Sequence, residues 1–92
     1  MQSARIKVIN EVGLHARPAA LFVQACQQHP AEIRVRNLAN GSDWVDGKSI
    51  LSVLTLGVEK DHEIEIQAEG PGEAEAIAAL TALISSDFEG RA

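Results

Sequence analysis

The 92-residue sequence is poor in cysteine, in aromatic residues and in basic residues. Its one cysteine, Cys26, cannot form a disulfide within the chain, and no Cys/His spacing typical of a metal site is present. Eight lysines and arginines stand against thirteen aspartates and glutamates, which gives a net charge of −5. This balance argues against binding to nucleic acid or to an anionic membrane surface, because both attract clustered basic residues.

Long hydrophobic stretches are also missing. The longest apolar run, Ile50–Val58, is interrupted by polar residues and by a glycine. It is far shorter than the roughly 20 apolar residues that a membrane-spanning helix needs. The first residues, MQSARIKVINEV, lack the apolar core of a secretory signal. We therefore expect a cytoplasmic protein with one domain, residues 1–92, and a modest hydrophobic core.

The hydrophobic pattern predicts the element order βαββαβα. Alternating apolar and polar residues predict strands at Arg5–Ile9, Glu32–Arg36, Asp43–Asp46 and Glu63–Ala68. Apolar residues at helical spacing predict helices at Ala16–Gln28, Ile50–Leu56 and Glu73–Ser86. Since each strand has one apolar and one charged face, we expect an α+β fold. A four-stranded antiparallel sheet would carry three helices on one face and be open to water on the other.

The same periodicity assigns residues to the two faces. The expected core stripes of the first and third helices are Ala19, Phe22, Val23 and Cys26, and Ile77, Leu80, Leu83 and Ile84. We interpret the charged strand residues as solvated, without a specific role: Arg5, Lys7, Arg34, Arg36, Glu63 and Glu65. His29 and His62 lie at element ends and are expected to face solvent.

The stretch Gly13–Ala19, GLHARPA, places a histidine next to a helix start. The first N–H groups of a helix have no partner within it, and the helix dipole adds partial positive charge, so a phosphate would be held there. Arg17 can add a forked contact with the same anion. These positive charges favour a neutral imidazole, which is a nucleophile. The residues therefore indicate a phosphoryl site at His15, with the N–H groups of Ala16 and Arg17 as phosphate contacts. From the spacing alone, a capping histidine beside an exposed arginine is an equal alternative.

Two blocks of the sequence resemble the HPr family, the histidine-containing phosphocarrier proteins of the bacterial phosphoenolpyruvate-dependent sugar phosphotransferase system. The first block is GLHARPA and the second is Lys48–Gly57, KSILSVLTLG. The resemblance covers nearly the whole chain. It implies an open-faced β-sandwich that relays a phosphoryl group without a cofactor or metal, as a carrier and not as a stand-alone catalyst.

The resemblance also implies partners and roles for individual residues. Enzyme I would phosphorylate His15 at Nδ1, Arg17 would steady the phosphoryl group, and enzyme IIA domains would receive it in sugar uptake. We expect a monomer, and we expect Leu21 to be an exposed apolar residue of the partner face, with a partly covered surface leucine as the alternative. The expected partner face consists of Ala16, Ala20, Leu21, Gln24, Gln27, Lys48, Ile50, Leu51 and Leu54.

Several alternatives stay open at this stage. Ser49 is the expected N-cap of the second helix and matches the position that an HPr kinase/phosphorylase modifies in related proteins. Leu51 and Ser52 depart from the kinase-regulated pattern, so regulation through Ser49 stays undecided. The segment Asn37–Gly47 is longer than in typical members, and it leaves a nitrogen-type or dihydroxyacetone-type paralogue as an alternative. Its Trp44 is interpreted as cover for a sheet edge. A small-molecule-binding domain is disfavoured, because no polar cluster suited to a pocket is evident.

Overall fold

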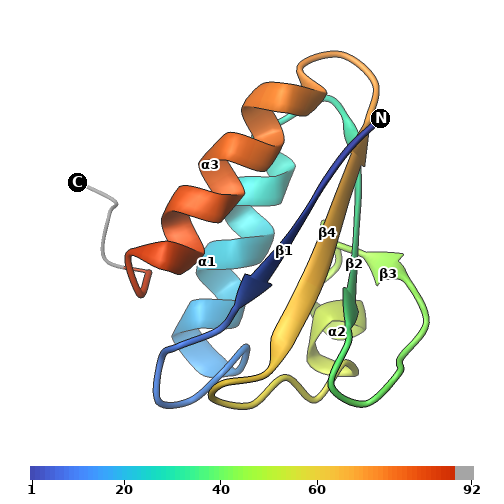
Figure 1. The fold of residues 1–92 in the computed structure, drawn as a ribbon. Helices are drawn as coiled ribbons and strands as arrows, with labels where there is room; N and C mark the ends of the chain where they lie inside the picture. The colour runs from blue at the N-terminus through green and yellow to red at the C-terminus, as the bar shows by residue number, and fades with distance from the viewer. Residues whose placement is uncertain (89–92) are drawn as a thin grey trace.

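The strands and helices follow the predicted order βαββαβα in the computed structural model, which describes residues 1–88. The elements are β1 (Gln2–Lys7), α1 (Ala16–Gln27), β2 (Glu32–Asn37), β3 (Val45–Asp46), α2 (Ile50–Leu54), β4 (Glu63–Glu69) and α3 (Glu73–Ser85). The strands form one antiparallel sheet in the order β1-β4-β2-β3, with the short β3 at an edge (Figure 1). The predicted fold class is confirmed.

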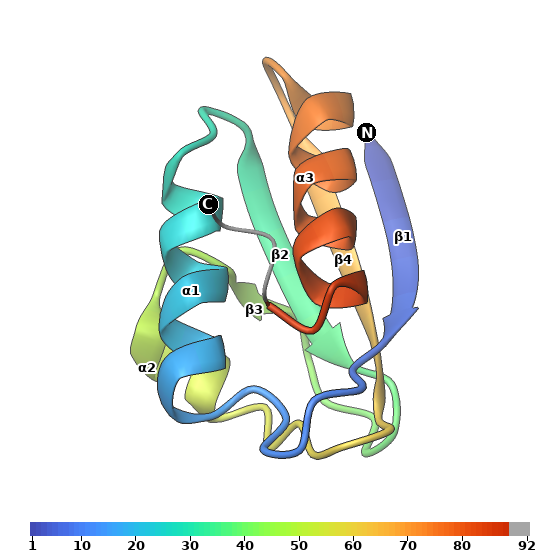
Figure 2. The same ribbon diagram turned by 90° about the vertical axis from the view of Figure 1, so that its left-hand side faces the viewer.

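All three helices lie on one side of the sheet (Figures 1 and 2). The alternation in β4 explains this arrangement, because Ile64, Ile66 and Ala68 are fully buried beneath the helices. The core stripe predicted for α1 is confirmed in full. In α3 the buried residues are Ala76, Leu80 and Ile84, whereas Ile77 and Leu83 are only partly buried at the margin of the core.

The open face of the sheet is more ordered than the sequence indicates. Glu65 of β4 lies between Arg5 of β1 and Arg36 of β2 in the strand register. Its carboxylate accepts from Arg36 Nη2 at 2.6 Å and lies 3.8 Å from Arg5 Nε. The Arg36 guanidinium also stacks on the Trp44 ring, 4.6 Å from its centroid. Three of the six charged residues interpreted as solvated, Arg5, Arg36 and Glu65, therefore also pair across strands on the open face.

Two element boundaries differ from the prediction. The first strand is Gln2–Lys7 and not Arg5–Ile9, because Val8 leaves the ladder to bond with the loop before β4, through His62 O and Asp61 N. Helix α2 ends at Leu54 and not at Leu56. The Leu56 carbonyl instead accepts hydrogen bonds from the side-chain amides of Asn37 and Asn40, which fixes the end of the helix.

Two further residues complete the core. Cys26 is fully buried, and the removal of its thiol from water raises its pKa to about 12. Phe88 packs against the core at the end of the described chain. Cys26 is therefore a packing residue and not a reactive thiol.

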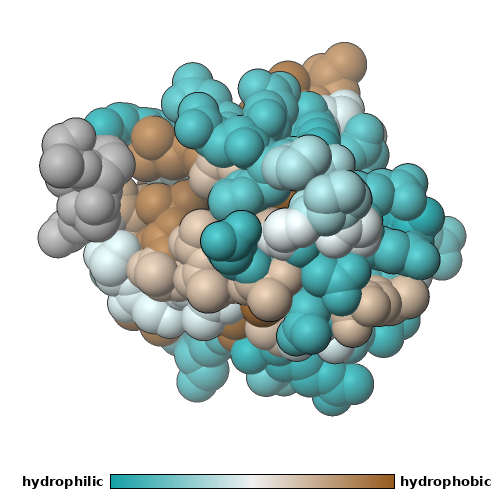
Figure 3. All heavy atoms as spheres, turned by 90° about the horizontal axis from the view of Figure 1, so that it is seen from above, coloured by the Kyte–Doolittle hydropathy of each residue, from teal (hydrophilic) through white to brown (hydrophobic). Residues whose placement is uncertain are grey.

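The two ends of the molecule are formed by different connections. Where β1 begins and β4 turns into α3, hydrophilic residues predominate on the surface, and hydrophobic residues show at the left and at the upper right edge of the view (Figure 3). At the opposite end, the β1–α1, β2–β3 and α2–β4 connections lie together (Figure 2). Within residues 1–88, no helix is long and apolar enough to cross a membrane.

Gly13 allows two of these connections to touch. It has a φ of +65°, and a Cβ at this position would lie 2.1 Å from the carbonyl oxygen of Val58. No side chain fits in that space, so the β1–α1 loop can approach the α2–β4 loop only with glycine here.

We therefore expect Gly13→Ala to lower the free energy of unfolding by about 2–5 kcal/mol, from backbone strain together with overpacking. Gly41→Ala is the matched control, because Gly41 has a φ of +67° and nothing within 4 Å of its Cβ position. That variant should lose only the backbone term, about 1–2 kcal/mol. Urea denaturation gives both values, and equal losses would show that the close approach at Gly13 carries no cost.

Candidate functional site

His15 is the N-cap residue of α1, with extended backbone angles of −131° and 164°. Its carbonyl accepts from Ala19 N at 3.4 Å, but its side chain makes no capping hydrogen bond. The imidazole is 38% exposed, so it lies at the surface beside the helix start. His15 therefore occupies the capping position beside an exposed arginine, as in the alternative interpretation, but its side chain does not cap the helix.

The helix start is shaped by the next three residues. Ala16 has a φ of +51°, the left-handed region that costs a non-glycine residue about 1–2 kcal/mol. Pro18 has no N–H group, so the N–H groups that open the helix are those of Ala16 and Arg17. Both residues are exposed. An anion beside His15 could therefore reach two backbone donors and the Arg17 guanidinium.

The loop that carries His15 is fixed from below. Leu14 is fully buried, and its N–H donates to the Val58 carbonyl at 3.0 Å. Asn10 is also buried, and its side-chain amide donates to the Gly13 carbonyl at 2.7 Å. The position of His15 is thus set by its neighbours in the chain, and its ring stays free for chemistry.

Sequence reasoning missed Glu59, which lies in the loop between α2 and β4. Its Oε2 atom is 3.4 Å from Nε2 of His15. The backbone N–H of Glu59 donates to Nδ1 of His62, and the Asn37 side-chain amide lies 3.2 Å from the same nitrogen. His62 is partly exposed, and its ring also bonds to this loop, which the sequence did not indicate. No motif links these residues, so the sequence contained no signal for them.

The predicted partner face is largely assembled on α1 and α2. Ile50, Leu51 and Leu54 expose 40%, 75% and 37% of their surface. A shallow hollow of about 310 Å³ separates the two helices, lined by Ala20, Val23, Gln24, Gln27 and Ile50. Four of these five are predicted partner-face residues. The Gln27 side chain also donates to the Lys48 carbonyl at 3.1 Å, which ties α1 to the start of α2.

Leu21 does not occupy the position predicted for it. It is half-buried against the core and lines a different hollow, between α1 and α3, together with Ala79 and Leu83. The helix rotates Leu21 toward α3, and α3 covers part of its side chain. Of the two interpretations of Leu21, the partly covered surface leucine is therefore the one that the structure shows.

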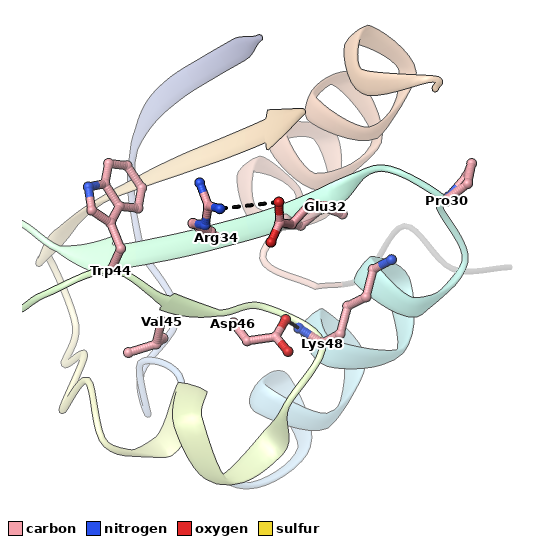
Figure 4. A pocket seen from close by; sticks show the side chains of 8 residues that line it. Pro30, Glu32, Arg34, Trp44, Val45, Asp46 and Lys48 are labelled. Carbon is pink, nitrogen blue, oxygen red and sulfur yellow. Dashed lines mark hydrogen bonds and ion pairs between the residues drawn. The ribbon is translucent and has the colours of Figure 1, made fainter. Parts of the chain in front are cut away.

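A further hollow of about 490 Å³ lies at the β2–β3 edge (Figure 4). Lys48 is the one predicted site residue in its lining, and its Nζ donates to the His29 carbonyl at 2.7 Å. Polar groups do gather here, contrary to the sequence analysis. They bond to one another, however: Arg34 pairs with Glu32 at 3.1 Å, and Asp46 accepts from Lys48 N at 2.9 Å. The hollow therefore has few polar groups left for a ligand.

Ser49 caps α2 as predicted. Its side-chain oxygen accepts from Ser52 N at 3.3 Å, and its carbonyl accepts from Val53 N at 3.0 Å.

In residues 1–88, no group of three or more His, Cys, Asp and Glu side chains is placed to hold a metal ion.

Comparison with known proteins identifies the family of this chain. The family model described as "PTS HPr component phosphorylation site" matches residues 2–86. The chain belongs to the HPr family. It is 40% identical to the phosphocarrier protein HPr of Pseudomonas aeruginosa, over 97% of both chains. It is also 36% identical to the phosphocarrier protein NPr of Klebsiella oxytoca, over 91% of both chains.

The fold agrees equally well with an HPr structure. A crystal structure of HPr-C-His from Thermoanaerobacter tengcongensis matches with a TM-score of 0.91 and 40% identity, and the match covers 100% of both chains. The match spans the whole chain, so it includes the segment between β2 and α2.

The capping contact of Ser49 gives a stability prediction. We expect Ser49→Ala to lower the free energy of unfolding by about 1 kcal/mol, because Ser52 N loses its acceptor. Ser49→Asp keeps a side-chain acceptor at the N-cap and should retain most of the stability. Urea denaturation of both variants and the wild type provides the comparison. An alanine variant as stable as the wild type would mean that the cap contributes nothing.

Proposed function

We propose that this HPr-family protein relays a phosphoryl group from enzyme I, through Nδ1 of His15, to enzyme IIA domains in sugar uptake. One observation carries the proposal. The His15 ring is 38% exposed at the start of α1, in the same turn as the backbone N–H groups of Ala16 and Arg17, and the Arg17 residue is itself exposed.

The chemistry needs little more than this arrangement. The Nδ1 lone pair attacks the phosphorus, the new N–P bond forms, and the donor takes back the electron pair of the bond that breaks. The incoming group carries about two negative charges, as phosphate esters do at neutral pH. The helix start and Arg17 stabilise that charge. Because the site is open, partner enzymes supply the remaining catalytic groups.

The partner face follows from the same surface. Leu51 is the most exposed of its apolar residues, and the hollow between α1 and α2 can receive a side chain from a partner. An exposed apolar patch beside a charged site suits a short-lived complex. All of these groups come from one chain, so we propose that the carrier acts as a monomer in the cytoplasm.

An NPr-type carrier is the second candidate. The observation that favours it is the 36% identity to an NPr over nearly the same range as the match to an HPr. Both candidates use the same histidine. They differ in which enzyme I-type donor and which acceptor domain recognise the α1–α2 face. The rates of phosphoryl transfer from each type of donor to this protein distinguish the two candidates.

Phosphoryl uptake tests the proposed acceptor. We expect the wild type, incubated with enzyme I and phosphoenolpyruvate, to gain one phosphate that is stable in base and lost in acid. Intact-protein mass spectrometry measures it. His15→Ala should gain none, because it lacks the nucleophile, and His29→Ala should gain as much as the wild type. Failure of the wild type with enzyme I from its own cell would overturn the carrier function.

Charge on the partner face tests the docking surface. We expect Leu51→Glu to raise the KM for transfer from enzyme I without loss of stability, because a carboxylate replaces an exposed apolar contact. Ala78→Glu, on the exposed side of α3, adds the same charge elsewhere and should leave KM unchanged. Steady-state transfer rates with varied carrier concentration give KM. Equal KM values for both variants would place the partner face somewhere else.

A further inference from the structure

A carboxylate stands beside the proposed phosphoryl acceptor, on a loop far from it in the sequence. The Oε2 atom of Glu59 lies 3.4 Å from Nε2 of His15, and the two side chains are 64% and 38% exposed. Glu59 belongs to neither of the two sequence blocks that carry the family resemblance. The reaction described so far uses Nδ1 of the ring and leaves the role of Nε2 open.

The carboxylate decides which ring nitrogen holds the proton. A neutral imidazole has one N–H group and one lone pair, and the partner of one nitrogen sets the state of the other. A lone pair on Nε2 would face a negatively charged oxygen and be repelled, whereas an N–H at that position is attracted. We propose that Glu59 is a positioning residue: it keeps the proton on Nε2 of His15, which leaves the lone pair on Nδ1 for attack on phosphorus. This inference rests on the proposed function, in which His15 accepts the group.

The same contact acts during the transfer. As Nδ1 forms its bond to phosphorus and the donor's bond breaks, the Nε2 proton stays in place and the ring becomes positive. Glu59 then faces a cation and stabilises it. An aspartate beside the histidine of serine proteases combines the same two tasks, fixing the tautomer and stabilising the imidazolium. Arg17 serves the phosphoryl group, so the two opposite charges act on different parts of the product.

Glu59 is held in place by the fold. Its N–H donates to Nδ1 of His62 at 3.0 Å. The preceding residue, Val58, is buried, and its carbonyl accepts from Leu14 N next to His15. The loops that carry the two side chains are therefore hydrogen-bonded to each other, which fixes their separation without the carboxylate itself.

The same pair of loops offers a matched control. Glu11, which precedes His15 in the β1–α1 loop, pairs with Lys60 at 3.2 Å. Glu11→Gln removes one negative charge from this end of the molecule, as Glu59→Gln does, but leaves the contact with His15 intact. Comparing the two variants thus separates the effect of the lost negative charge from the effect of the lost contact with His15.

The first measurement is the tautomer of His15, read from long-range proton–nitrogen NMR correlations at alkaline pH. We expect the wild type to hold the proton on Nε2. Glu59→Gln should raise the ratio of the Nδ1–H to the Nε2–H form by about two- to fivefold, the range expected for an exposed ion pair. Glu11→Gln should leave the ratio unchanged. Equal ratios in both variants would overturn the inference.

The second measurement is the single-turnover rate of transfer from phosphorylated enzyme I. Glu59→Gln should slow the step by about two- to fivefold at saturating carrier, while Glu11→Gln retains the wild-type rate. A normal wild-type rate with no difference between the variants overturns only the role of Glu59. No phosphoryl uptake by the wild type overturns the proposed function itself, and the inference with it.

Discussion

The site depends on one backbone contact, between the N–H of Leu14 and the carbonyl of Val58. It joins the loop before α1 to the loop after α2 at a point where glycine at position 13 lets the two backbones approach. Leu14 anchors the contact from inside, because its side chain is fully buried. A hydrogen bond next to a buried leucine is protected from water, so it fixes geometry better than any contact between exposed side chains could.

This contact explains how an open site can be well defined. His15, Arg17 and Glu59 are all substantially exposed, and ion pairs between such groups contribute little to stability on their own. Their relative positions are set by the backbone beneath them. The left-handed Ala16 follows from the same constraint, because the chain must turn at once from the anchored loop into the helix. The core thus holds the geometry, and the surface groups are left to interact with the phosphoryl group.

Most of the fold could be predicted from the sequence because its patterns are local. The alternation in Glu63–Glu69 and the stripe at Ala19, Phe22, Val23 and Cys26 depend only on the period of one element. The cap formed by Ser49 likewise depends only on residues close to it in the sequence. The end of α2 at Leu54 could not be predicted in this way, because it depends on two asparagine side chains that bond to Leu56, one from the end of β2 and one from the β2–β3 connection. The orientation of Leu21 could not be predicted for the same reason, since it depends on where α3 packs.

The residues of the candidate site likewise differ in whether the sequence alone could reveal them. The motif GLHARPA contains the groups that a phosphate would meet, because they follow one another at a helix start. Glu59, and His62 that bonds to it, come close to the ring only through the pairing of two loops, and their residue types carry no spacing that could reveal them. A carrier must accept a phosphoryl group and also give it up, so its product cannot be bound too tightly. In the proposed reaction, donors at the helix start would stabilise the phosphoryl group, while the carboxylate would keep the proton on Nε2, so that the ring leaves as neutral imidazole when the group is passed on. Placing these two effects on separate loops allows each to be adjusted without disturbing the other.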